Sequence, residues 1–80
     1  MNILIAEDER VNLNRLQRFL EKWGHRVHAA ANGLDALETF LSQEVDLIIT
    51  DWMMPKMDGI ELVRHIRGQG SSKPYVYIRR

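Results

Sequence analysis

The feature that most constrains the fold of this chain is a regular alternation between two apolar periods. Short runs in which nearly every residue is apolar are typical of strands buried on both faces of a sheet. Between them, apolar residues recur every three or four positions, as on one face of a helix. The expected strands are residues 2–6, 45–50 and 75–78, together with residues 26–30 (RVHAA), where the apolar pattern is weaker. The apolar faces of the expected helices span residues 16–23, 34–41 and 62–66.

Strands that alternate with helices form a parallel sheet, because each connection crosses back over one face of the sheet in a right-handed turn. The sequence therefore predicts one α/β domain over residues 1–80. Local signals mark the ends of the elements. Gly24 stands where a glycine closes the first helix, Asn32-Gly33 predicts a turn, and Asp58 is expected to cap the third helix. Residues 68–72 predict a flexible connection, because four of these five residues are glycine or serine.

Composition excludes several classes of function. Eleven basic residues balance eleven acidic ones, so no net charge attracts a nucleic acid or an anionic membrane. The chain has no cysteine, which excludes disulfides, thiolate metal sites and thiol catalysis. The apolar run at residues 3–6 is far shorter than the ~20 residues of a membrane helix, and no secretory signal is readable. We expect a cytoplasmic domain that binds neither membrane nor nucleic acid directly.

Carboxylates follow two of the most apolar runs. Glu7 and Asp8 come after residues 2–6, and Asp51 comes after residues 45–50. Ligands of open α/β sheets bind beyond the carboxyl ends of the strands. If these two strands are neighbours, three carboxylates converge on one cleft. Their mutual repulsion would oppose folding, and a hard divalent cation with oxygen ligands, best Mg²⁺, would relieve it. A carboxylate beside that metal could attack phosphorus.

Each of these acids alone also has a simpler interpretation. An acidic residue between a strand and a helix often caps the helix or interacts with its dipole. The placement of all three at strand ends favours a metal site. Charge placement alone does not identify phosphate as the reacting group.

Two segments resemble the receiver domains of bacterial two-component response regulators. They are residues 3–9 (ILIAEDE) and residues 45–59 (VDLIITDWMMPKMDG). The acidic pair, the string D-x-x-M-P-x-M-D-G and the spacing between them carry the resemblance, which runs from Met1 to about Ile78. It implies a flavodoxin-like, doubly wound parallel sheet with strand order 2-1-3-4, counted along the chain. The family's full sheet has five strands in the order 2-1-3-4-5, of which flavodoxin and a chemotaxis receiver are the standard examples.

The resemblance implies a role for each matching residue. Asp51 would accept a phosphoryl group from a sensor histidine kinase or a phosphotransfer protein. Asp8 would bind Mg²⁺ directly, Glu7 would act through a bound water, and the main-chain carbonyl of Met53 would complete the metal shell. The chain would then be a phosphoprotein of a phosphorelay, a signalling domain that at most phosphorylates itself from small donors. A Mg²⁺-aspartate phosphatase is disfavoured, because its second aspartate would stand at Met53.

Two further residues match the family in the loop that follows Asp51. The differences from the family pattern come late in the chain. Pro55 and Gly59 would shape the loop after the acceptor and the start of the third helix. The family's Ser or Thr at the end of the fourth strand and the Lys at the end of the fifth are missing. Losing one preorganised donor typically lowers a rate by roughly 10²–10³. We therefore expect an incomplete receiver domain, truncated in its fourth strand, with impaired phosphorylation.

Truncation also leads to an alternative function. An unprotected fourth strand and an uncovered sheet face predict a homo-oligomer, formed by edge pairing or by exchanged elements. The chain would then be a non-signalling, self-associating scaffold.

Several residues invite a functional interpretation but have a structural one. The three histidines fit no zinc motif and are expected to be ordinary surface or boundary residues. Trp23 is expected in the core, and Trp52 beside the cleft. Met53, Met54 and Met57 are expected to pack in the loop and the core. Residues 79–80 are expected to be a solvated terminus, with phosphate binding as the alternative.

Overall fold

The computed structural model describes residues 1–68 and 74–79. Strands and helices alternate along the chain as the sequence predicts. They are β1 (Asn2–Ala6), α1 (Arg10–Lys22), β2 (Arg26–Ala30), α2 (Gly33–Ser42), β3 (Leu47–Asp51), α3 (Gly59–Arg67) and β4 (Tyr75–Arg79). Of the predicted flexible connection, all but Gly68 lies outside the described residues.

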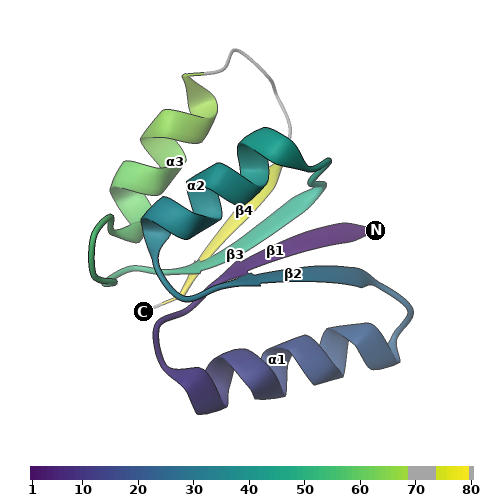
Figure 1. The fold of residues 1–80 in the computed structure, drawn as a ribbon. Coiled ribbons are helices and arrows are strands. Elements are labelled where there is room, and N and C mark those ends of the chain that lie inside the picture. Colours follow the sequence, from purple (N-terminus) through teal and green to yellow (C-terminus); the bar gives the residue numbers. More distant parts are fainter. Residues whose placement is uncertain (69–73, 80) are drawn as a thin grey trace.

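The four strands form one parallel sheet in the order β2-β1-β3-β4, which confirms the predicted class and strand order. Helix α1 lies on one face of the sheet, and α2 and α3 lie on the other (Figure 1). The register pairs Ala6 with Thr50 and Asp51 with Arg79. The carboxyl ends of β1, β3 and β4 therefore meet at one edge of the sheet.

The core lies between the sheet and the helices α2 and α3. All residues from Ile3 to Ala6 are buried, which explains why the first run is continuously apolar. Side chains of β1 and β3 pack there against Ala36, Leu62 and Ile66 of the two helices.

Strand β3 begins at Leu47, two residues later than the sequence predicts. Asp46 explains the difference, because its carboxylate takes the place of a main-chain partner. Its Oδ2 accepts a hydrogen bond from the Asn2 N–H at 2.8 Å, and its own N–H donates to the Asn2 carbonyl at 2.8 Å. Asp46 is thereby hydrogen-bonded to Asn2 at the start of β1, one residue before the regular pairing of β1 with β3 begins.

Helix α1 differs from the prediction on its apolar face. The expected core residue Trp23 is 69% exposed and Phe19 is 59% exposed, so the prediction for Trp23 is wrong. Their rings contact each other instead, with centroids 6.4 Å apart. The physical reason is the place of α1, which contacts β2 and β1. The part of the face that holds Phe19 and Trp23 therefore packs on no covering layer among the described residues.

The predicted turn residues Gly24 and Asn32 lie at the end of α1 and the start of α2. Gly24 closes α1 with φ +88°, and the N–H groups of Gly24 and His25 donate to the carbonyls of Glu21 and Leu20 at 3.0 and 3.2 Å. This is the Schellman arrangement that favours glycine. Asn32 does not form a simple turn: its side chain accepts from the Asp35 N–H at 2.8 Å and caps α2.

Candidate functional site

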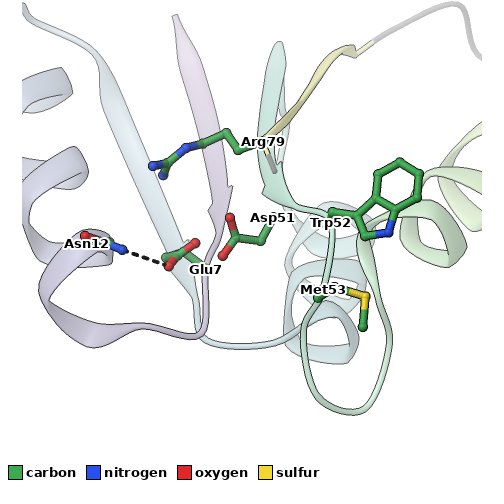
Figure 2. A pocket seen from close by; sticks show the side chains of 6 residues that line it. All are labelled: Glu7, Asn12, Asp51, Trp52, Met53 and Arg79. Carbon is green, nitrogen blue, oxygen red and sulfur yellow. Dashed lines mark hydrogen bonds between the residues drawn. The ribbon is translucent and has the colours of Figure 1, made fainter.

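Three carboxylates come together at the carboxyl ends of β1 and β3. Because Ala6 and Thr50 are register partners, the residues that follow them stand side by side. One carboxylate oxygen from each of Glu7, Asp8 and Asp51 lies within 4.8 Å of the others. Figure 2 shows the Asp51 carboxylate directed toward Glu7. The structure thus has the convergence that is expected when these two strands are neighbours.

Among the described residues, no ion pair neutralises the charge of this cluster. Glu7 is only 3% exposed, Asp51 is half-buried and Asp8 is exposed. From the described part of the chain, the Glu7 carboxylate accepts two long hydrogen bonds, both from neutral donors: the Glu9 N–H at 3.3 Å and the Asn12 amide at 3.5 Å. Burying a charge without an opposite one is costly. The cluster is therefore suited to a cation.

A third acidic residue after β1, Glu9, leads the chain into α1. The Glu9 side chain accepts hydrogen bonds from the N–H groups of Val11 at 3.3 Å and Asn12 at 2.8 Å, so it caps α1. Capping holds the Glu9 carboxylate on the helix, apart from the cluster. It also places Asn12, on the first turn of α1, within reach of Glu7.

The loop that follows Asp51 is fixed by a tight turn and by buried methionines. The Met57 N–H donates to the Pro55 carbonyl at 2.8 Å, and Lys56 between them has φ +70°, which describes a γ-turn. Met57 is buried and Met54 packs against the core, as expected, but Met53 is 71% exposed.

Helix α3 begins in close contact with the end of β3. The Asp58 side chain accepts from the Glu61 N–H at 2.8 Å, which confirms the predicted cap. The Gly59 N–H donates to the Trp52 carbonyl at 3.0 Å. A Cβ on Gly59 would lie 2.2 Å from the Asp51 carbonyl oxygen. Only glycine therefore allows α3 to start this close to Asp51.

A pocket of about 620 Å³ opens beside the carboxylates. Its lining residues, drawn in Figure 2, are Glu7, Asn12, Asp51, Trp52, Met53 and Arg79. Two of them were not expected. No pattern in the sequence identifies Asn12 as a site residue, because it lines the pocket only through its place on the first turn of α1. Arg79 was expected in a solvated terminus, with phosphate binding as the alternative; it is half-buried and lies in register with Asp51.

Other candidate groups lie apart from this pocket. None of the three histidines lines it. Instead, the N-terminal ammonium of Met1 donates a hydrogen bond to the His25 Nδ1 at 3.2 Å.

Within residues 1–68 and 74–79, Glu7, Asp8 and Asp51 form the one group of three or more residues arranged to hold a metal ion. In the same residues, no helix is both long enough and apolar enough for a membrane span.

Comparison with known families decides the identity of this arrangement. The family model of the response regulator receiver domain matches residues 3–78 of this sequence. The chain belongs to this family. The resemblance that the acidic pair and the D-x-x-M-P-x-M-D-G string carry is thereby confirmed, and the carboxylate cluster lies in a receiver domain of a two-component system.

Individual receiver proteins show how far the likeness extends. The chain is 46% identical over 74 residues to the sensor protein EvgS of Escherichia coli, covering 92% of this chain and 6% of that protein. It is 35% identical over 78 residues to the response regulator MprA of Mycobacterium tuberculosis, covering 98% and 34%. The chain thus spans a small part of EvgS and about a third of MprA.

A solved structure shares the fold closely. The response regulator TrrA of Thermotoga maritima, crystallised in complex with Mg²⁺ and BeF, superposes with a TM-score of 0.84 at 32% identity. The match covers 96% of this chain and 64% of the TrrA chain.

Proposed function

We propose that this receiver domain accepts a phosphoryl group on Asp51, with Mg²⁺ held by Glu7, Asp8, Asp51 and the main-chain carbonyl of Met53. The approach of the three carboxylates to within 4.8 Å is the observation that supports the proposal most strongly. An all-oxygen donor set with few carboxylates suits Mg²⁺. The TrrA structure, which contains Mg²⁺ and BeF, supports the same assignment.

Asp51 is the carboxylate best placed to be the nucleophile. Glu7 and Asp51 both line the pocket, but Glu7 is buried and accepts two hydrogen bonds, whereas Asp51 is half-buried. In the proposed reaction an Asp51 carboxylate oxygen forms a bond to phosphorus. The bond from phosphorus to the donor breaks, and the leaving group keeps its electron pair. Mg²⁺ would supply charge neutralisation at the phosphoryl oxygens.

The donor we propose is a sensor histidine kinase or a phosphotransfer protein, and the setting is cytoplasmic phosphorelay signalling. We propose no direct contact with nucleic acid. In the described residues no Lys, Ser or Thr side chain lines the pocket. We therefore propose slow phosphorylation for residues 1–80 taken alone. Pro55, in the γ-turn, and Gly59, at the start of α3, would hold the loop beside the acceptor.

Mg²⁺ binding should depend on Asp51. Trp52 lines the pocket and therefore reports on it. Trp23 follows the last residue of α1, a helix roughly 20 Å long whose first turn lies at the pocket, so Trp23 can be replaced by Phe. In that background, Mg²⁺ should change the fluorescence. Asp51→Asn should weaken the Mg²⁺ affinity by about 10- to 100-fold, because a charged ligand is lost.

The matched control is Glu38→Gln, which removes an exposed carboxylate from α2. This variant should bind Mg²⁺ as the parent does. Equal affinities in the parent and in Asp51→Asn would contradict a metal site at these carboxylates.

A scaffold function is the second candidate, and the β4 side of the sheet favours it. Strand β4 is an edge strand of the sheet that residues 1–68 and 74–79 form, and its Tyr75 and Tyr77 are 69% and 61% exposed. Their register partners Leu47 and Ile49 are only half-buried. These four residues form an apolar patch beside a strand edge that no other described strand pairs with, which favours association with another copy.

The chain of residues 1–80 should therefore self-associate at high micromolar concentration. Light scattering should give a mass above the 9.4 kDa of one chain. Tyr77→Lys should shift the mass toward the monomer, because a charge on an edge strand opposes pairing. Leu41→Lys, at an equally exposed residue of α2 (60%), should leave it unchanged. A monomeric parent would exclude the scaffold function.

A further inference from the structure

One basic side chain reaches into the acidic pocket. Of the six residues that line it, Arg79 is the only one with a positive charge. Figure 2 shows the Arg79 side chain extending from the end of β4 across the strands, toward the side of the pocket where Asn12 lies. Nothing in the proposed roles of Glu7, Asp8 and Asp51 accounts for this guanidinium.

The backbone fixes Arg79 in this place. Asp51 and Arg79 are register partners in neighbouring parallel strands, so their side chains leave the same face of the sheet. The Trp52 N–H donates to the Arg79 carbonyl at 2.8 Å and prolongs the pairing by one residue. Arg79 also lines an adjoining groove with Leu16 and Phe19 of α1, where apolar surface suits the methylene stem of an arginine.

The balance of charges at the site suggests a role for this guanidinium. Three carboxylates and one divalent cation leave one negative charge, which Arg79 matches. Transfer of a phosphoryl group to Asp51 adds further negative charge on the phosphoryl oxygens. Among the described residues, no hydrogen bond or ion pair engages the Arg79 guanidinium. Its fork of N–H donors is therefore available for an anion, with the geometry that suits phosphate.

We propose that Arg79 binds the phosphoryl group at Asp51, donating hydrogen bonds from its guanidinium to the phosphoryl oxygens. This inference rests on the proposed function of Asp51. With an acyl phosphate as donor, the Asp51 oxygen bonds to phosphorus and the bond from phosphorus to the donor's oxygen breaks. The departing carboxylate keeps the electron pair, and Arg79 stays protonated throughout. Before the anion binds, the same positive charge opposes Mg²⁺.

The two roles of Arg79 predict shifts of opposite sign. The probes are Mg²⁺ alone and beryllofluoride added at saturating Mg²⁺, both followed by Trp52 fluorescence in the Trp23→Phe background. Arg79→Gln should weaken the beryllofluoride affinity by about 10- to 100-fold, because charge-assisted hydrogen bonds are lost. It should strengthen Mg²⁺ binding by roughly twofold or more, because a like charge is removed. General damage to the fold would weaken both.

Two further variants complete the experiment. Arg79→Lys keeps the charge without the planar fork, so it should bind Mg²⁺ as the parent does and recover part of the beryllofluoride affinity. Arg26→Gln removes an exposed arginine at the opposite end of the strands and should change neither affinity.

The possible results separate this inference from the proposed function. If the parent binds Mg²⁺ and beryllofluoride and Arg79→Gln binds both equally well, the role of Arg79 is wrong and the proposed function stands. If Arg79→Gln weakens both affinities to the same extent, Arg79 is structural and its proposed role is again wrong. If the parent binds neither probe, the proposed function fails, and the role of Arg79 fails with it.

Discussion

Replacing Gly59 with alanine should destabilise the fold by about 1–3 kcal/mol or more, the usual cost of overpacking. The added Cβ would lie 2.2 Å from the Asp51 carbonyl oxygen, and a main-chain atom cannot rotate away as a side chain can. Relief would require α3 to move from the end of β3, where the Gly59 N–H donates to the Trp52 carbonyl. Urea denaturation followed by circular dichroism measures the change.

Gly68→Ala is the control for the Gly59 substitution. Gly68 ends α3 with φ −63°, and a Cβ there would lie 3.4 Å from its nearest neighbours, an ordinary contact. Its free energy of unfolding should change by less than about 0.5 kcal/mol, or increase slightly. Equal effects of the two substitutions would show that the close approach of α3 to Asp51 is wrong.

Asp51→Asn should abolish phosphoryl incorporation from a small acyl phosphate. The amide has no negative charge, and its oxygen is a poor nucleophile toward phosphorus. Asp8→Asn keeps the acceptor but removes a proposed metal ligand, so it should slow incorporation and raise the Mg²⁺ concentration required. Time courses at several Mg²⁺ concentrations measure both effects. Incorporation at the parental rate in Asp51→Asn would place the acceptor on another residue.

Most of the fold could be predicted from periodicity, because burial on both faces of a strand and on one face of a helix leaves a direct pattern in the sequence. Ile3–Ala6 and the face of α3 at Leu62 and Ile66 are buried as expected. Helix α1 is the exception. Its pattern shows that one face is apolar, but only the arrangement of α1 over β2 and β1 determines that Trp23 stays exposed.

The acidic part of the site was predictable for a topological reason. Carboxyl ends of neighbouring parallel strands meet at one edge, so residues that directly follow strands can be brought together without knowledge of side-chain packing. Asn12 and Arg79 were missed because their positions depend on more. Asn12 depends on the cap that Glu9 provides, and Arg79 depends on the register between β3 and β4.

The most direct test of Asp51 as phosphoacceptor is the intact mass of the chain after incubation with an acyl phosphate and Mg²⁺. The proposed chemistry predicts an adduct of one phosphoryl group that requires Mg²⁺ and that is missing in Asp51→Asn. Circular dichroism of the same samples establishes that both proteins are folded. A folded parent chain without the adduct, or an adduct that persists in Asp51→Asn, would contradict the role of Asp51.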